Sequence, residues 1–331
     1  MAASARPGEF ELIERYFRPL PTSPGSLGLT DDAAFLRPDP DTDTVVTADI
    51  VVAGIHFFAD DPPASIARKA LRVNLSDLAA KGAHPETYLL TIALAPDWTE
   101  AWIAGFAEGL AGDQARYGVS LLGGDTSRAA GGTAISITAF GRLPTDSMVH
   151  RSGARPGDVV FVSGTVGDAA LGLRLRQGTI AAGEGAGFLL DRYLHPEPRV
   201  ALAGAVRAFA TAAMDVSDGL VGDLGHICKA SGVTAEIGAG TVPLSAAAAA
   251  VVAADPALLA TVLTGGDDYE ILATVPAANA ATYAEAAREA GVPVTIIGRI
   301  VEGRGPPTVL DASGAVLPLG RRSFDHFGAK G

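Results

Sequence analysis

The stretch "AAMDVSDGLVGDLG", residues 212–225, joins an apolar segment to the start of a helical pattern. Asp215, Ser217 and Asp218 lie at the junction, and Asp223 follows inside the expected helix. Backbone N–H groups at a helix N-terminus attract anions such as phosphate. Aspartates would repel that phosphate, so the arrangement calls for a cation between them. By itself, Asp218 is also explained as a helix cap, and Asp223 is expected to be a solvated residue on the helix face.

Length and composition point to two folded domains. The chain has 331 residues, of which 48% are hydrophobic and 19% charged, while single cores stop growing at about 250–300 residues. Strand and helix patterns alternate in both halves, which predicts an α/β or α+β fold. Gly and Pro turn signals favour a boundary near 144–152, giving domains 1–148 and 149–331. Strands are expected at 44–49, 88–95, 119–125 (ending in a glycine turn), 133–143, 159–163, 234–237, 269–275 and 294–300. Helices are expected at 64–83, 99–118, 185–194, 198–210, 219–231, 245–254 and 277–291, and a glycine-bounded helix start is expected within 150–173, after the strand at 159–163.

Charge and cysteine content exclude several classes of protein. The net charge is −12, and no basic stripe suggests nucleic-acid binding. No apolar run approaches the roughly 20 residues of a membrane span, and the start has no apolar signal-peptide core. The single cysteine, Cys228, excludes an internal disulfide and a cysteine metal cage. A cytoplasmic protein is expected.

Six segments share one pattern, in which an apolar element is followed by small residues and then by an acid. They are "GLTDDAAF" (28–35), "VTADI" (46–50), "NLSD" (74–77), "LLGGDTSR" (121–128), "MDVSDGL" (214–220) and "TGGDDYE" (264–270). Each segment alone is better explained as a turn or helix cap. Together they predict convergent carboxylates, whose hard oxygen atoms suit Mg²⁺ and its phosphate ligands.

Other motifs add less. The chain lacks G-x-x-x-x-G-K-[ST], the protein-kinase set and G-x-S-x-G. Arg151 at the domain junction is equally well a phosphate ligand or a surface residue. His56 and Tyr117 are more often packing residues than ligands. Phe324 is explained either by packing of the C-terminal segment or by a lid over an aromatic ligand.

Several motifs together resemble the thiamine-monophosphate kinase family. They are "GEFELIERYF", "TDDAAFL", "TADIVVAGIHF", "KALRVNLSDLAAKGA", "LLGGDTSR", "RSGARPGD", "MDVSDGLVGDLGHICKAS", "TGGDDYEI" and "SFDHF". They occur in the family's order over nearly the whole chain. The wider superfamily includes aminoimidazole-ribonucleotide synthetase and selenophosphate synthetase.

The resemblance implies a two-domain fold of the aminoimidazole-ribonucleotide synthetase type. Its N-terminal domain would form a homodimer, and ATP would bind in a cleft between the domains with several Mg²⁺ ions. The implied activity is ATP-dependent phosphorylation of thiamine monophosphate to thiamine diphosphate, the last step of thiamine diphosphate biosynthesis. The enzyme would be a phosphotransferase with a phosphate group as acceptor.

The resemblance also implies roles for individual residues. The metal ligands would be Asp32, Thr47, Asp49, Asp77, Asp125, Asp215 and Asp218, of which Asp49, Asp125 and Asp218 are the catalytic candidates. ATP would contact Tyr117, Gly124, Asp125, Arg151 and Ser217. Thiamine monophosphate would contact His56, Asp267 and Phe324.

Two positions depart from the family's pattern. The family often has Gly-Asp-Asp where this chain has Thr30-Asp31-Asp32, and Ser-Thr-Asp where it has Thr47-Ala48-Asp49. Ala48 has no hydroxyl, so a metal contact there would come from backbone or water. Two alternatives stay open: another ATP-dependent synthetase of the superfamily, and a non-catalytic, metal-bound dimeric scaffold.

Overall fold

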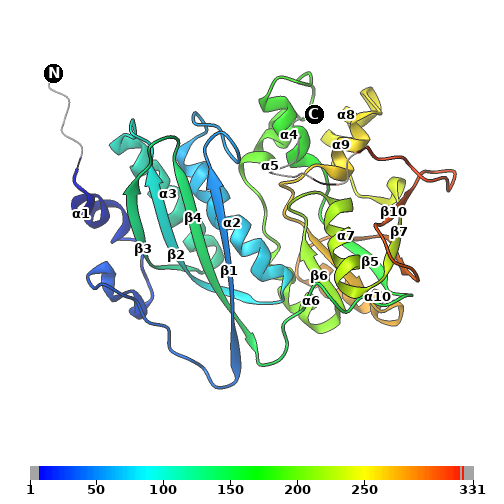
Figure 1. The fold of residues 1–331 in the computed structure, drawn as a ribbon, viewed down its shortest axis with the longest axis horizontal. Helices are drawn as coiled ribbons and strands as arrows, with labels where there is room; N and C mark the ends of the chain where they lie inside the picture. Colours follow the sequence, from blue (N-terminus) through cyan, green and yellow to red (C-terminus); the bar gives the residue numbers. More distant parts are fainter. Residues whose placement is uncertain (1–6, 321–322, 324–331) are drawn as a thin grey trace. The chain divides into compact units, whose positions relative to one another are not determined.

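The computed structural model describes residues 7–320 and residue 323. The contacts of the chain divide it into two compact units (Figure 1). Unit 1 comprises the chain up to Leu78 together with His84–Asp146, and unit 2 comprises Ala79–Ala83 and the chain from Ser147 onward. Phe324 lies outside the described residues.

Unit 1 is built on one four-stranded sheet and two long helices. Its strands run in the order β1-β4-β2-β3, with β2 and β3 parallel and the other neighbours antiparallel. Thr99 caps helix α3 by accepting the Trp102 N–H, and Gly118 ends it in the left-handed conformation. The elements are α1 (Glu9–Leu12), the π-helix η1 (Ile13–Phe17), the 3₁₀ segment η2 (Pro24–Leu29), β1 (Thr42–Val52), α2 (Pro63–Ala80), β2 (His84–Leu94), α3 (Glu100–Tyr117), β3 (Ser120–Arg128) and β4 (Ala134–Pro144).

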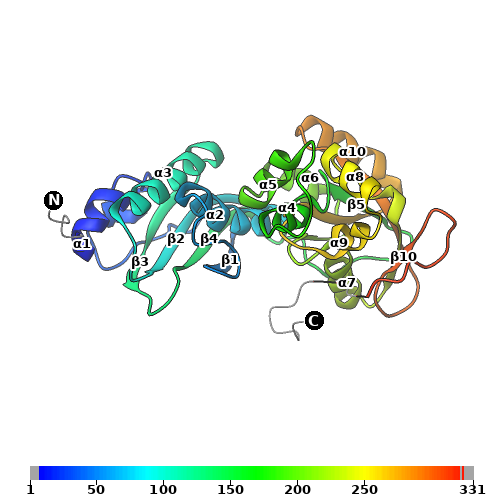
Figure 2. The same cartoon turned by 90° about the horizontal axis from the view of Figure 1, so that it is seen from above.

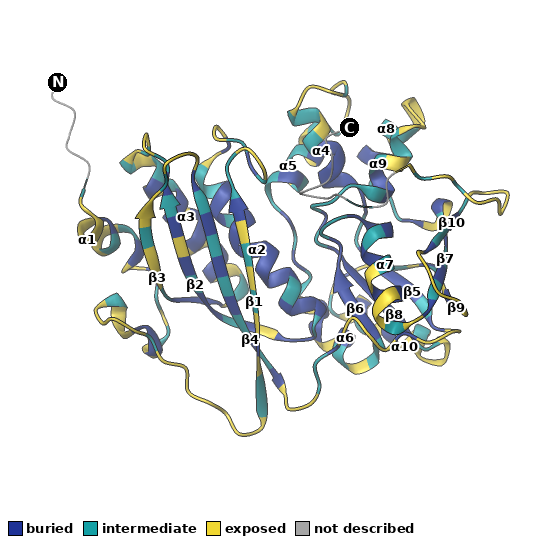
Figure 3. Cartoon of the chain, viewed as in Figure 1, coloured by how far each residue is buried: buried dark blue, intermediate teal, exposed yellow. Residues whose placement is uncertain are grey.

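The two faces of this sheet differ. Figures 1 and 2 show α2 and α3 on one side of it. Along β4, half-buried and buried residues alternate from Ala134 to Leu143, as expected when one face packs on helices and the other does not. Figure 3 shows exposed positions along β1 and β3. On β1 these include Val46 and Ile50, each 54% exposed.

Unit 2 surrounds a six-stranded sheet with the order β10-β7-β9-β5-β8-β6. Only the β10–β7 pair is parallel. The elements are β5 (Val159–Ser163), α4 (Asp168–Arg176), α5 (Ala186–Leu194), η3 (Val200–Leu202), α6 (Ala203–Phe209), β6 (Ala212–Asp215), α7 (Leu220–Ser231), β7 (Thr234–Gly238), η4 (Ala239–Thr241), α8 (Ala246–Ala254), α9 (Leu258–Thr264), β8 (Ile271–Val275), η5 (Ala277–Asn279), α10 (Ala280–Glu289), β9 (Val294–Val301) and β10 (Thr308–Leu310).

This second sheet is covered on both faces. Val160 and Val162 of β5 pack in one hydrophobic cluster with α7, whereas Phe161 packs in another with Tyr283 of α10. Burial on both sides explains why consecutive residues of β5, β6 and β8 are buried and mostly apolar. Because β8 is antiparallel to both β5 and β6, the end of each of these strands meets the start of β8.

The last two residues of α2 and the connection to β2, together Ala79–Ala83, belong to unit 2. Ala79 and Ala80 belong to the cluster around Phe161. The Lys81 ammonium donates to the Ala213 carbonyl at 2.6 Å, and the Arg207 guanidinium donates to the Gly82 carbonyl at 2.5 Å. Residues from the first half of the chain therefore complete the core of the second unit.

Most expected elements are present, with one clear correction. The segment 119–125 does not end in a glycine turn, because β3 continues through both glycines to Arg128. The expectations contained no α1, α9 or β10, which the structure adds. Among the described residues, no helix combines the length and apolar character that a membrane crossing requires.

Candidate active site

The first acidic site lies between β1 and α2. Thr47 and Asp49 are alternate residues of β1, so their side chains leave the same face of the strand. The Thr47 hydroxyl donates to an Asp77 carboxylate oxygen at 2.5 Å, and the Asp49 backbone N–H donates to the Asn74 side chain at 3.1 Å. The structure thus brings together three of the predicted metal ligands.

The two carboxylates of this site repel each other. Burial, and then the negative charge of Asp77, raise the pKa of Asp49 from 3.8 to about 6. Near neutral pH the folded protein therefore holds partly desolvated negative charge at this point. A bound cation would offset the repulsion between the two carboxylates. Such repulsion in the metal-free protein is expected of a metal site.

Ala48 faces away from this site. It is exposed, whereas Thr47 and Asp49 on either side of it are half-buried. Val46 and Ile50 share its face by the same alternation. The departure from the family's pattern at Ala48 therefore removes no side-chain oxygen from the group around Asp77.

Further predicted residues line a pocket of about 730 Å³ in unit 1. Asp32 lies on its wall, as do Gly124 and Asp125 of β3. Apolar side chains such as Ile13 and Leu122 form other parts of the same wall. A pocket that combines apolar surface with carboxylates can take an aromatic ring linked to cation-bound phosphates.

Gly124 is required by the packing of β3 against β2. A Cβ atom at this position would lie 1.8 Å from the Leu90 carbonyl oxygen. Leu122 is an extra residue in the pairing of the two strands, a local bulge. The bulge and the glycine together place Asp125 on an extended backbone, with its side chain exposed.

The two aromatic candidates of unit 1 have contacts within the protein. The His56 Nδ1 atom accepts the Val52 backbone N–H at 3.1 Å, which closes the turn after β1. The Tyr117 ring lies beneath the guanidinium groups of Arg116 and Arg72, at 5.1 and 5.6 Å from its centroid. These contacts explain both residues by packing, and their contacts with a ligand stay predictions.

The second acidic site is in unit 2, at the end of β6. Asp215 is the last residue of that strand and is 3% exposed, while Ser217 and Asp218 in the following turn are half-buried. Three hydrogen bonds of 2.8 Å join residues 216–217 to residues 267–270: Asp267 N–H to the Ser217 carbonyl, Tyr269 N–H to the Val216 carbonyl, and Val216 N–H to the Glu270 carbonyl.

Gly266 permits this close pairing of the two turns. A Cβ atom there would lie 2.2 Å from the Ser217 carbonyl oxygen. The predicted substrate ligand Asp267 is thereby held beside the turn that carries Ser217 and Asp218.

The prediction that Asp223 is solvated is wrong. Asp223 is 1% exposed, and one of its carboxylate oxygens accepts the backbone N–H groups of Asp218 and Gly219, each at 3.1 Å. Burial, and then the charge of Asp218, raise its pKa from 3.8 to about 7. Asp223 lies three residues after Leu220 and four before Ile227, both buried. That helical spacing was the sequence signal for a buried position.

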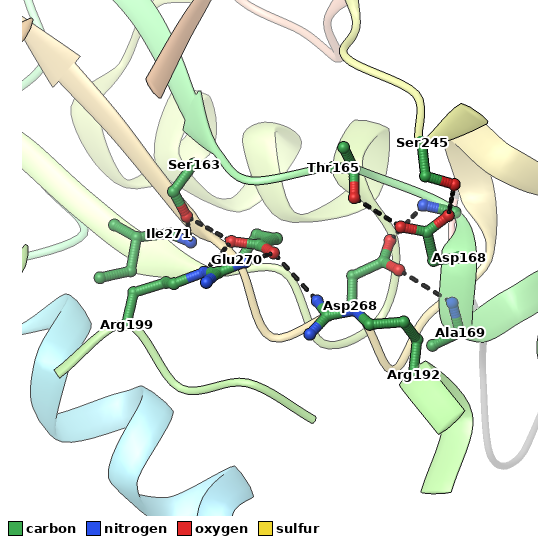
Figure 4. A network of polar contacts seen from close by, with 11 residues as sticks. Ser163, Thr165, Asp168, Ala169, Arg192, Arg199, Ser245, Asp268, Glu270 and Ile271 are labelled. Atoms are coloured by element: carbon green, nitrogen blue, oxygen red, sulfur yellow. Dashed lines mark hydrogen bonds and ion pairs between the residues drawn. The ribbon is translucent and has the colours of Figure 1, made fainter. Parts of the chain in front are cut away.

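Two further buried acids were missed as members of the site. Asp268 and Glu270 are 1% and 0% exposed and belong to a polar network with residues of β5, α4 and α5 (Figure 4). Their partners lie between about 70 and 110 residues away in the chain. No local sequence pattern signals such contacts.

Arg151 is exposed, and its carbonyl accepts the Ser231 hydroxyl at 3.5 Å. Its role toward phosphate stays a prediction. The same holds for Phe324, which lies outside the described residues.

The oxygen ligands suit Mg²⁺ bound together with a phosphate. Within residues 7–320 and 323, no three His, Cys, Asp or Glu side chains are grouped closely enough to hold a metal ion by themselves. Mg²⁺ commonly takes one or two carboxylates and fills its shell with water and substrate phosphate. Asp49 with Asp77 offers such a pair in unit 1, and in unit 2 Asp215 and Asp218 lie three residues apart at the end of β6. The residues fit Mg²⁺ in that mode and do not form a caged structural site.

The two units and their acidic loops define a protein of the AIR synthase related class. Residues 30–143 match the N-terminal domain of AIR synthase related proteins, and residues 155–310 match the C-terminal domain. The chain is 45% identical over 307 residues to the thiamine-monophosphate kinase of Caulobacter vibrioides, covering 92% of this chain and 87% of that protein. The chain belongs to the thiamine-monophosphate kinase family.

Solved structures agree with this assignment. The crystal structure of thiamine-monophosphate kinase from Stenotrophomonas maltophilia K279a matches with a TM-score of 0.82 and 39% identity, covering 94% of this chain and 98% of that chain. AaThiL complexed with AMPPCP and TMP matches with a TM-score of 0.75 and 29% identity, covering 98% and 100%. The expected two-domain fold of the aminoimidazole-ribonucleotide synthetase type is therefore confirmed.

Proposed function

We propose that this chain transfers the γ-phosphoryl group of ATP to thiamine monophosphate, forming ADP and thiamine diphosphate. The observation that carries the proposal is the match over nearly the whole chain to thiamine-monophosphate kinases. A solved relative that binds AMPPCP and TMP together supports ATP as the phosphoryl donor. The carboxylates of the two acidic sites would bind the cations that a reaction between two anionic phosphates requires. Because the reaction consumes ATP, we expect it in the cytoplasm.

Cation-assisted phosphoryl transfer gives each aspartate a role as a ligand. The residues that would hold Mg²⁺ are Asp32, Thr47, Asp49, Asp77 and Asp125 in unit 1, and Asp215 and Asp218 in unit 2. When bound, Mg²⁺ neutralises phosphate oxygens and reduces the repulsion between two anionic reactants.

The chemistry needs no covalent enzyme intermediate. An oxygen of the acceptor phosphate attacks the γ-phosphorus of ATP in line, and a new P–O bond forms. The bond from the γ-phosphorus to the β–γ bridging oxygen breaks, so ADP leaves with the electron pair. A phosphate monoester has a second pKa of about 6, so the acceptor is largely deprotonated near neutral pH. No side chain is needed as a general base.

The remaining residues position the reactants. Tyr117, Gly124, Arg151 and Ser217 contact ATP in this proposal. His56, Asp267 and Phe324 contact thiamine monophosphate. Asp267 is supported by its position, because its backbone is hydrogen-bonded to Ser217 beside Asp218.

We further propose that the chain acts as a homodimer joined through the open face of the unit 1 sheet. Val46 and Ile50 are each 54% exposed on that face, and a second copy would bury them. An Ile50→Asp variant is expected to elute as a monomer in size-exclusion chromatography with light scattering. Ile296→Asp, at a position 50% exposed in unit 2, is the matched control and keeps the dimer. A dimer that survives Ile50→Asp would contradict this interface.

The activity itself is tested with purified protein, ATP, Mg²⁺ and thiamine monophosphate. ADP is followed by a coupled assay, and thiamine diphosphate is measured by chromatography. Equal amounts of the two products are expected. Formation of ADP with aminoimidazole precursors but not with thiamine monophosphate would point to another ATP-dependent synthetase. The absence of both products would favour the non-catalytic scaffold.

A further inference from the structure

Residues 264–270 form a turn between α9 and β8 whose alternate residues have different environments. Asp268 and Glu270 are 1% and 0% exposed, whereas Asp267 and Tyr269 are half-buried. Asp267 and Tyr269 have φ angles of +73° and +52°. Two residues other than glycine in the left-handed region, so close together, mark a strained backbone that its surroundings must hold in place.

Glu270 holds one end of this turn through charged partners (Figure 4). The Arg199 guanidinium donates to both of its carboxylate oxygens, at 2.6 and 2.5 Å. Arg192 donates to one of them at 3.0 Å. The Ser163 hydroxyl donates to Glu270 at 2.6 Å and accepts the Ile271 N–H at 2.8 Å.

Asp268 holds the middle of the turn against the start of α4. One carboxylate oxygen accepts the Gly167 N–H at 2.7 Å, and the other accepts the Ala169 N–H at 3.3 Å. Asp168, between them, is itself fixed by the hydroxyl groups of Thr165 and Ser245 (Figure 4). The inward-facing acids are thus bound to three elements of unit 2 outside the turn.

Stability alone does not explain the buried ion pairs of Glu270 with Arg192 and Arg199. Each charge loses hydration when it is buried, and replacing a buried ion pair by apolar side chains is often neutral or stabilising. The network instead holds the strained backbone of residues 264–270 in one conformation. In this conformation, Asp267 lies beside the turn that carries Asp218.

We infer that Glu270, Asp268, Arg199 and Arg192 are positioning residues that hold Asp267 in the geometry required to bind the acceptor substrate. The inference rests on the proposed function, because it takes the acceptor to be thiamine monophosphate. The network touches no substrate itself and acts through the backbone of residues 264–270.

Two variants and one control test this inference. Glu270→Gln removes the charge but keeps the shape of the side chain, and Arg199→Lys keeps the charge but loses the two-nitrogen contact. Asp158→Asn is the control, since Asp158 is a 5% exposed carboxylate of unit 2 that accepts the Arg155 N–H and the Thr211 hydroxyl. Dissociation constants for thiamine monophosphate and AMPPCP, KM and kcat are measured for folded protein.

For Glu270→Gln and Arg199→Lys, binding of thiamine monophosphate is expected to weaken by about 10- to 100-fold, as small misplacements of a binding group do. The KM for ATP stays within error of the wild-type value. Hydrogen exchange of the peptide over 264–270 becomes faster in both variants. Asp158→Asn changes the melting temperature without changing either the exchange or the binding of thiamine monophosphate.

The outcomes separate this inference from the proposed function. If wild-type protein neither binds nor phosphorylates thiamine monophosphate, the proposed function fails, and the inference fails with it. Suppose that the wild type is active and that Asp267→Ala weakens the binding of thiamine monophosphate. Unchanged binding of thiamine monophosphate in both Glu270→Gln and Arg199→Lys would then overturn the inference and leave the proposed function standing. Equal weakening of ATP and thiamine monophosphate, or equal effects in the control, also overturns it.

Discussion

Replacing Asp49 with asparagine is expected to stabilise the metal-free protein while removing its activity. In the folded state, burial and the charge of Asp77 raise the pKa of Asp49 from 3.8 to about 6. A rise in pKa from 3.8 to about 6 corresponds to about 3 kcal/mol, because a tenfold change in proton affinity is about 1.4 kcal/mol. This is an upper value, and a gain of about 1–3 kcal/mol in the free energy of unfolding is expected near pH 8.

The effect depends on pH in a definite direction. Below pH 3.8, Asp49 is protonated in both the folded and the unfolded chain, and its carboxylate costs nothing. As the pH rises from 3.8 to about 6, the unfolded chain releases its proton first, so stability falls. Above about pH 6 the loss is complete. The asparagine side chain of the variant carries no charge at any of these pH values, so its advantage is greatest at about pH 8 and shrinks toward about pH 4.

Thermal unfolding in EDTA at about pH 5 and about pH 8 measures this effect. For a chain of this size, about 1–3 kcal/mol corresponds to a rise in Tm of roughly 2–10 °C at the higher pH. Adding Mg²⁺ should raise the Tm of the wild type more than that of the variant, because the variant has lost a ligand. A variant with wild-type circular dichroism and an equal or lower Tm at the higher pH would refute the raised pKa of Asp49.

Three other substitutions have definite expected results. Asp218→Asn keeps the fold but lowers kcat by roughly 100-fold or more, because a carboxylate near the reacting phosphates is lost; full activity at ordinary Mg²⁺ would rule out its role as a ligand. Asp223→Ala leaves two N–H groups without an acceptor and should destabilise the protein by about 2 kcal/mol in denaturant unfolding. Asp223→Asn keeps an acceptor oxygen and should lose less, and the reverse order would contradict the assigned contacts. Gly124→Ala forces a Cβ atom against the Leu90 carbonyl and should cost about 3 kcal/mol or more, so a wild-type Tm would show that β3 and β2 can separate there.

Elements with a periodic apolar pattern and end signals could be predicted from the sequence. Helix α3 has a Thr cap, a Gly end and a regular pattern between them, and the range 99–118 expected for it agrees with Glu100–Tyr117. Strand β5, expected at 159–163, is found at Val159–Ser163, since a continuous apolar run is typical of a strand buried on both faces. Helix α9 has an apolar segment of similar character, and periodicity alone does not separate a short buried helix from a strand.

Within the candidate site, the sequence predicts which residues act together better than it predicts how deeply each residue is buried. Thr47, Asp49 and Asp77 are expected to act together, and their hydrogen bond and shared charge repulsion agree with this. Asp223 was misjudged because charged residues are rarely buried without partners, and its partners are backbone N–H groups that the sequence does not display. Glu270 depends on Arg192 and Arg199, and only the folded chain brings such distant residues into contact.

The packing of Ala79–Ala83 in unit 2 means that the two units are not independent modules of the gene. A fragment that begins at Ser147 would lack the lysine that donates to the Ala213 carbonyl, the carbonyl that accepts from Arg207, and two alanines of its core. A fragment that ends at Asp146 would instead carry those alanines without their partners. No single cut yields two complete units. Recombination that exchanges one half of the chain between relatives must therefore also preserve the short segment Ala79–Ala83, which is encoded in the other half.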